Sequence, residues 1–167
     1  MSQLSYSTLP APFAGMRVDM MRDDIRSLVN TDVLNVPFGV AVAQGNIGTN
    51  GDNAAVLPSG STFKFLGAVA HSHTYDNGPN GLLTPTGLKP TAVLDVLSQG
   101  RIWVLVEEAV NAEDPAFVRF VAGPGGTQLG AWRKSADTAS AGAVKARYRT
   151  SAGAGGFAQV EILSVDQ

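Results

Sequence analysis

The sequence predicts an all-β fold: an antiparallel β-sandwich, a jelly-roll-like sandwich or a small β-barrel, with an extended N-terminal arm. Two observations support this prediction. The 19 glycines and 9 prolines make up 28 of the 167 residues and separate short apolar runs, as turns separate strands. Near the C-terminus, two runs alternate polar and apolar side chains, which is the period of a half-buried strand. About seven or eight runs of this kind suit an antiparallel all-β architecture.

Residues 1–35 are predicted to form the N-terminal arm and a short apolar segment, and residues 36–167 a single β domain. Residues 1–16 show no hydrophobic periodicity, so their order should depend on what they dock against. Between Asp19 and Asn30, apolar residues recur at helical spacing. This spacing predicts a helix of two or three turns, with an extended segment as the alternative.

The next apolar runs are predicted to be strands. Residues 36–44 and 63–71 are apolar and are bounded by loops rich in glycine and asparagine. Residues 116–121 follow a turn that contains Pro115. These runs should form buried strands of the β body.

A hairpin is predicted where residues 91–97 and 101–106 flank Ser98-Gln99-Gly100. In residues 101–106, both alternating faces are apolar. This strand is therefore expected to be central and covered on both sides, with Trp103 in the core.

A second hairpin is predicted at the C-terminus, from residues 145–150 and 157–163 with a glycine-rich loop between them. An antiparallel register with an even index sum places five polar residues of the two strands on one face, namely Lys145, Arg147, Arg149, Gln159 and Glu161. The same register gathers the apolar residues on the other face, namely Ala146, Tyr148, Ala158, Val160 and Ile162.

Composition excludes several functions. The 12 basic and 14 acidic residues give a net charge of −2, too little to hold a nucleic acid or an anionic membrane. The absence of cysteine excludes disulfides, thiolate nucleophiles and cysteine-ligated metals. No apolar run approaches the roughly 20 residues of a membrane span, and the first residues lack the features of a signal peptide. We therefore expect neither nucleic acid nor membrane as a partner.

Catalytic and metal-binding patterns are weak. His71 and His73 could bind one metal ion from the same face of a strand, with Asp76 as a third ligand. The spacing is similar to that of a cupin metal site, but the chain has only two histidines and lacks the third histidine and the nearby acidic ligand of such a site. Neighbouring residues of a strand point to opposite faces. This argues against Ser72 as a nucleophile activated by His71. It also argues against a catalytic carboxylate pair at Glu107-Glu108, which we expect to be a solvated strand end. Gly123-Pro124-Gly125-Gly126 lacks the lysine of a phosphate loop and predicts a turn. We expect no enzyme activity, no cofactor and no metal.

The low charged fraction, 16%, favours a surface that contacts other proteins. The arm could insert into a groove of a partner or pack on its own sheet, and the sequence leaves both alternatives open. The candidate contact residues are Leu9, Pro10, Phe13, Met16, Met20, Met21, Tyr75 and Trp132.

Six segments follow one another in a distinctive order: Pro37–Val42, Gly67–His71, Gly87–Thr91, Val93–Val106, Ala116–Val121 and Ala146–Glu161. Their succession, from about Val36 onward, resembles the structural cement proteins of tailed phages, which are also called head decoration proteins. Residues 45–53 and 135–144 have no counterpart in this resemblance.

The resemblance implies a non-enzymatic protein that binds the outside of an assembled, expanded capsid and bridges neighbouring major capsid proteins. It also implies self-association, with a homodimer favoured and a homotrimer possible. The expected location is the outer capsid surface of the virion, after synthesis in the cytoplasm of the bacterial host. The alternative functions are a carbohydrate-binding module that uses Trp132, Tyr75 and Tyr148, and a metal-dependent enzyme at His71 and His73.

Overall fold

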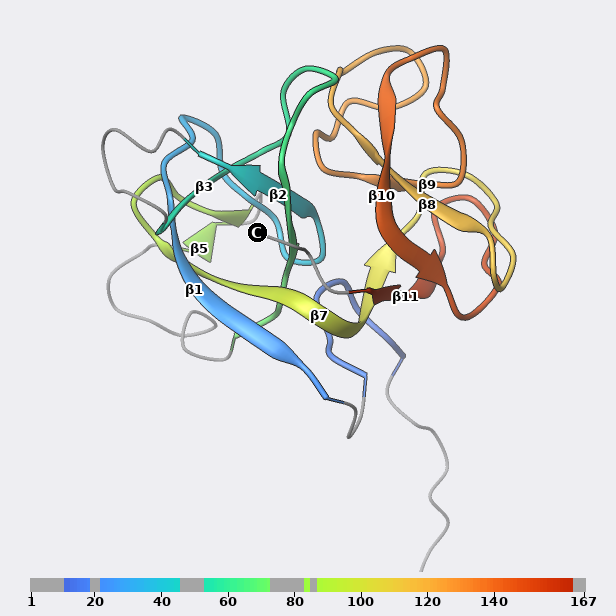
Figure 1. Cartoon of the computed structure of the whole chain (residues 1–167), viewed down its shortest axis with the longest axis horizontal. Helices are drawn as coiled ribbons and strands as arrows, with labels where there is room; N and C mark the ends of the chain where they lie inside the picture. Colours follow the sequence, from blue (N-terminus) through green and yellow to red (C-terminus); the bar gives the residue numbers. More distant parts are fainter. Residues whose placement is uncertain (1–10, 19–21, 46–52, 73–82, 85–86, 164–167) are drawn as a thin grey trace, which may run out of the picture.

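The computed structural model describes residues 11–18, 22–45, 53–72, 83–84 and 87–163 (Figure 1). The elements within these ranges are β-strands, and no helix there is long and apolar enough to cross a membrane. The strands are β1 (Asp24–Asn30), β2 (Ala41–Gln44), β3 (Ala54–Val56), β4 (Phe65–Val69), β5 (Leu83–Thr84), β6 (Gly87–Leu88), β7 (Val93–Leu105), β8 (Pro115–Arg119), β9 (Trp132–Arg133), β10 (Ala141–Tyr148) and β11 (Phe157–Ile162).

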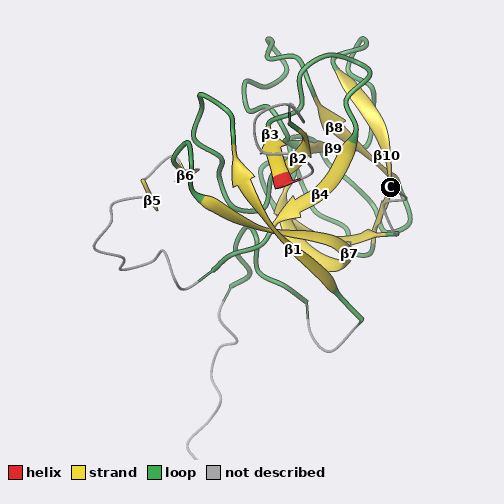
Figure 2. Ribbon diagram, turned by 60° about the vertical axis from the view of Figure 1, so that its left-hand side comes forward, coloured by secondary structure: helices red, strands yellow, loops and turns green. Residues whose placement is uncertain are grey.

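Nine of these strands form one continuous sheet in the order β1-β3-β2-β4-β7-β11-β10-β8-β9. β1 also pairs with β7, so β1, β3, β2, β4 and β7 close into a five-stranded barrel. β1 and β7 lie side by side in both ribbon views (Figures 1 and 2). The prediction of an all-β fold with a small barrel is confirmed.

The other half of the sheet also curls back on itself. Val106, directly after β7, forms an isolated bridge with Trp132 of β9, and the Glu107 N–H donates to the Trp132 carbonyl. Strands β7, β11, β10, β8 and β9 therefore make a second ring that shares β7 with the first. Figure 1 shows the two halves as separate lobes, with β1 to β5 in one lobe and β8 to β10 in the other.

β7 is a single strand of 13 residues, so the predicted hairpin at residues 91–106 is wrong. Ser98, Gln99 and Gly100 continue the strand instead of turning it. Gly100 has a φ of +128°, which a glycine tolerates without strain, and it marks the place where the partners of β7 change. Before Gly100 the strand pairs with β1 and β4, and from Gly100 onward with β11.

Residues 24–30 lie within the predicted short helix but form the strand β1, in agreement with the extended alternative; Asp19, Met20 and Met21 lie outside the described residues. β1 pairs antiparallel with β7 over Asp24 to Val29, and its burial alternates at the end that enters the barrel. The buried Asn30 side chain donates to the carbonyls of Leu34, Leu88 and Lys89 and so ties the end of β1 to the loop at Leu34 and to the end of β6. Pairing with β7 decides the conformation here, because a short apolar run has little conformational preference of its own. The division into residues 1–35 and 36–167 stays a prediction. β1 belongs to the first of these parts and pairs with β7 of the second.

The C-terminal hairpin is confirmed in its register and in its two faces. Ala146 pairs with Ile162, Arg147 with Glu161 and Tyr148 with Val160, and each pair has an even index sum. The five apolar residues predicted to share the inner face are all buried. This face supplies much of the core inside the second ring.

The burial of the two tryptophans is the reverse of what the sequence predicts. Trp103 is only half-buried, because side chains of β7 alternate between a buried face and an open face beyond Gly100. Trp132 is 1% exposed and packs edge-on against Phe65. The prediction that β7 is covered on both sides here is therefore wrong, and Trp132 occupies the core position expected of Trp103.

Candidate functional site

The described part of the N-terminal arm packs against its own body. The Gly15 N–H donates to the Trp103 carbonyl, and the Trp103 N–H donates to the Met16 carbonyl, so the arm lies along the edge of β7 that β11 leaves free. The ring of His71 lies between Phe13 and Phe38, at centroid distances of 4.9 Å and 4.7 Å. Of the predicted arm contacts, Met16 is half-buried and Phe13 is 41% exposed. The other four lie outside the described residues: Leu9, Pro10, Met20 and Met21.

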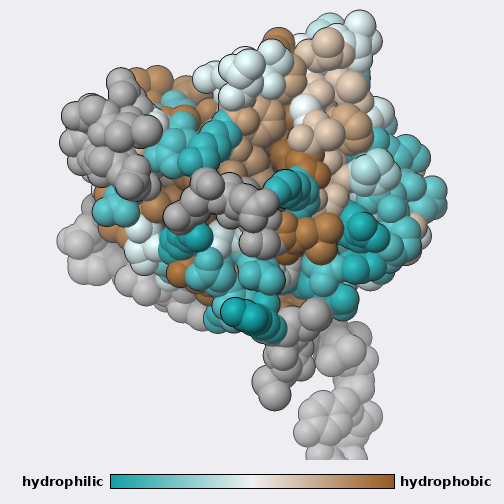
Figure 3. All heavy atoms as spheres, in the orientation of Figure 1, coloured by the Kyte–Doolittle hydropathy of each residue, from teal (hydrophilic) through white to brown (hydrophobic). Residues whose placement is uncertain are grey.

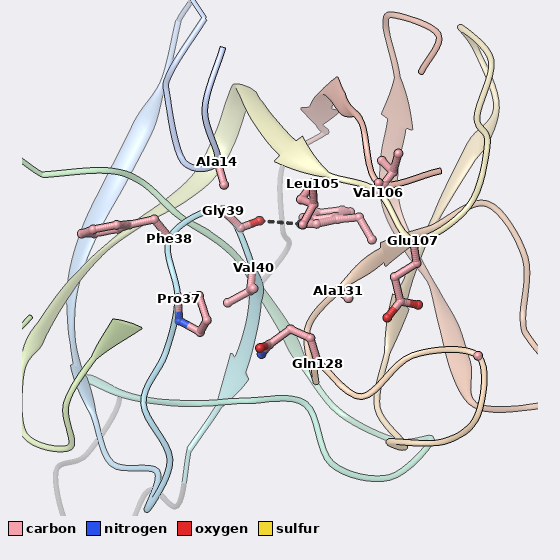
Figure 4. Close-up of a pocket in the computed structure, with 13 residues that line it drawn as sticks. Ala14, Pro37, Phe38, Gly39, Val40, Leu105, Val106, Glu107, Gln128 and Ala131 are labelled. Atoms are coloured by element: carbon pink, nitrogen blue, oxygen red, sulfur yellow. Dashed lines mark hydrogen bonds between the residues drawn. The ribbon is translucent and has the colours of Figure 1, made fainter. Parts of the chain in front are cut away.

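Next to the arm, an apolar groove of about 480 Å³ lies between the two rings (Figure 4). Trp132 lines it and donates its indole N–H to the Gly39 carbonyl at 2.7 Å, which joins the second ring to the segment before β2. The volume is within the usual range of about 300–1,000 Å³ for ligand sites. The lining residues are mostly apolar: Ala14, Pro37, Phe38, Gly39, Val40, Leu105, Val106, Glu107, Gly125, Gln128, Ala131, Trp132 and Gly155.

An exposed apolar pair borders this groove. Leu105 on β7 and Phe157 on β11 are register partners and are 50% and 37% exposed. On the same face, the next cross-strand pair is Trp103 and Gln159. We call Trp103, Leu105 and Phe157 the outer patch. In Figure 3, apolar surface runs through the middle of the displayed face between hydrophilic regions.

A second exposed apolar group comes from different segments. Val33 is 89% exposed, and Leu34 and Val121 are also exposed. Leu34 lines a hollow of about 390 Å³ together with Ala122, the neighbour of Val121. We call Val33, Leu34 and Val121 the loop patch. The described chain thus offers two distinct apolar surfaces to other proteins.

The prediction of a solvated Glu107-Glu108 pair is wrong, because both carboxylates belong to a partly buried ion network. The Arg119 side chain is 0% exposed and donates from Nε to Glu107 at 2.8 Å and from Nη2 to Asp137 at 2.6 Å. Arg133 adds a second cation, 2.9 Å from Glu107. The network holds the loop around Asp137 and Ala139, where three consecutive non-glycine residues have positive φ. The sequence clue was an arginine inside the apolar run of residues 116–121.

Glu108 acts as a cap for the segment after β9. Its Oε1 accepts hydrogen bonds from the Lys134 and Ser135 N–H groups and from the Ser135 hydroxyl. Burial acts to raise the pKa of Glu108, but these hydrogen bonds and the charge of Arg133 outweigh it and lower the pKa below its ordinary value. The hydrogen bond from Arg119 lowers the pKa of Asp137 in the same way.

We expect acid to destabilise the protein through these two carboxyls. A carboxyl whose pKa is lower in the folded state stabilises the fold above its unfolded pKa and loses that contribution as the pH falls through its folded pKa. The free energy of unfolding should therefore be nearly constant above about pH 5 and decline below about pH 4.5. Urea unfolding across this range measures the decline, and Glu108→Gln should make it shallower. An unchanged slope in that variant would contradict the role given to Glu108.

The remaining predicted site residues do not assemble a catalytic or sugar-binding site in the described chain. His73, Asp76 and Tyr75 lie outside the described residues, and no group of three or more potential metal ligands occurs within them. Trp132 and Tyr148 are buried, and the Tyr148 hydroxyl donates to the Arg133 carbonyl at 2.9 Å. The prediction that these two aromatic residues are exposed for stacking on sugars is wrong, and Trp132, predicted as a contact residue, is buried and only borders the groove.

Fold and surface together define a β-barrel structural protein whose prominent features are apolar contact surfaces. The chain belongs to the phage structural cement protein family: the family model described as "Structural cement protein (E217 gp24/Pam3 gp6)" matches residues 2–163. This membership gives it a structural, capsid-stabilising role associated with the virion, and it is not an enzyme.

A solved structure shares the fold. A chain from "The capsid of Myoviridae Phage XM1" superimposes with a TM-score of 0.70 at 15% sequence identity, and the match covers 99% of each chain. A comparison with curated proteins gives no match. The predicted resemblance to the cement proteins of tailed phages is confirmed by the family match.

Proposed function

We propose that this protein binds the outer surface of the expanded phage head and bridges neighbouring major capsid proteins, as a homodimer. The observation that carries the proposal is the presence of two apolar surfaces, the outer patch and the loop patch, on a member of the cement family. A bridging protein needs at least two contact surfaces, and buried aromatic and aliphatic anchors supply most of the binding energy at protein interfaces.

Bridging stabilises a shell by linking its subunits. A capsid subunit cannot leave until each link to its neighbour has broken, and attachment at one point raises the effective concentration of the second contact. Individually modest contacts therefore suffice. The net charge of −2 is consistent with attachment through apolar contacts.

The test is co-sedimentation of the purified protein with expanded heads that lack it, followed by heating of the loaded heads. We expect saturable binding and a higher disruption temperature, and the copy number per head would report which symmetry positions are filled. A homotrimer in solution would replace the proposed homodimer. Absence of binding to such heads would contradict the proposed function.

We expect the substitution Phe157→Glu to weaken head binding strongly. Phe157 is 37% exposed and, unlike Leu105, does not line the groove, so a charge there opposes an apolar interface without disturbing the core. Ile25→Glu is the matched control, because Ile25 is comparably exposed on β1 and belongs to neither patch. The measurement is co-sedimentation with thermal unfolding of each variant. Full binding by the folded Phe157→Glu variant would remove the outer patch from the capsid interface.

A further inference from the structure

We propose that the groove between the two rings binds residues 1–10 of a second copy of this chain. The inference rests on the proposed self-association and identifies the contact that produces it, and it does not depend on capsid binding. Three observations support it: the chemistry of the groove, the composition of residues 1–10, and the direction in which the arm leaves the groove.

The groove suits an uncharged, mostly apolar peptide. Its walls include Phe38, Val40, Leu105 and Trp132, and its one charged lining residue is Glu107. The Glu107 carboxylate is already bound by Arg119 and Arg133, so it has little capacity left for a charged ligand. A charged occupant would lose its hydration in the groove without gaining a partner.

Residues 1–10 have the composition that the groove requires. The segment MSQLSYSTLP contains no charged side chain, and Leu4, Tyr6, Leu9 and Pro10 are separated by small or polar residues. Ten extended residues span at most about 33–36 Å, which is ample for reaching a neighbouring copy. The segment leads into residues 15–18, which are hydrogen-bonded to β7 of their own subunit. An inserted segment would therefore link two bodies firmly.

The course of the arm favours a second copy over the same chain. Ala14 lines the groove at the tip of a turn, where the Met16 N–H donates to the Phe13 carbonyl. Both limbs of this turn lead away from the groove (Figure 4). The described residues of the arm, 11–18, therefore contribute only Ala14 to the groove and leave it open to another segment. Reciprocal exchange of this segment between two copies closes a symmetric dimer.

The experiment uses the purified protein without heads, so its outcome is independent of capsid binding. Sedimentation should show a dimer for the full chain and a monomer for a variant that lacks residues 1–10. A truncation that extends through Met16 would be unsuitable, because it removes the hydrogen bonds of Gly15 and Met16 to Trp103. A fluorescently labelled peptide of sequence MSQLSYSTLP should bind the shortened variant.

Gln128→Trp tests the groove itself. Gln128 is exposed and lines the groove, so a large ring there should fill it, weaken peptide binding at least tenfold and shift the full chain to monomer. Thr127→Trp is the matched control: it adds the same ring one residue away, beside the neighbouring hollow, and should leave binding intact. Three results would overturn the proposal: a monomeric full chain, a shortened variant that still dimerises, or a peptide that binds equally well to Gln128→Trp.

Discussion

Replacing Trp132 with alanine is expected to lower the free energy of unfolding by about 3–5 kcal/mol, the usual cost of removing a buried aromatic side chain. Trp132 is 1% exposed, packs against Phe65 and donates to the Gly39 carbonyl. Its loss would leave a cavity and an unpaired acceptor at the junction of the two rings. Urea unfolding followed by circular dichroism measures the change.

Trp103→Ala is the matched control, because the same ring is removed from a half-buried site on the same protein. We expect a smaller loss, about 1–2 kcal/mol, in line with partly exposed positions. Equal losses in the two variants, or a larger loss at Trp103, would contradict the assignment of Trp132 to the core.

Glu107→Ala is expected to destabilise the protein by at least about 3 kcal/mol, because it removes the main partner of a buried cation. Arg119 is fully enclosed and would keep Asp137 as its only anionic partner, besides the Val121 carbonyl, while Arg133 would lose its 2.9 Å contact. The loop around Asp137 should then become more mobile. Chemical denaturation measures the stability, and hydrogen exchange of residues 134–140 reports the loop.

Glu113→Ala is the control for this prediction. Glu113 also contacts two arginines, Arg147 and Arg149, but its side chain is 59% exposed. Water compensates for an exposed ion pair that is lost, so this variant should unfold nearly as the wild type does. If the two variants were equally stable, burial would not govern the strength of the network.

The sequence predicted the C-terminal hairpin in detail because its two strands carry a polar face and an apolar face in matching register. It did not distinguish the tryptophans. The run Ile102 to Val106 is apolar on both faces, and only the three-dimensional closure of the second ring decides which face is covered. Trp132 stands in a two-residue strand, too short for periodicity to indicate burial.

Long-range pairing explains the other differences. Ser98-Gln99-Gly100 has the composition of a turn. β7 nevertheless continues through it, because its backbone pairs with β1 before this point and with β11 after it. The ion network joins residues 107, 119, 133 and 137, which come together only when β8 and β9 pair. The groove likewise combines the arm, the segment before β2 and the end of β7. Such sites depend on topology, which local composition does not specify.

The strand β7 has a mechanical consequence. The backbone of β7 runs without interruption through both rings. A force that separates the rings therefore acts on the hydrogen bonds of β7 with β11 on one side of Gly100, or on its hydrogen bonds with β1 and β4 on the other side. Antiparallel hydrogen bonds lie perpendicular to the strand, so tension along β7 loads many of them simultaneously. Separating the two halves of the protein along β7 would therefore break many hydrogen bonds at the same time.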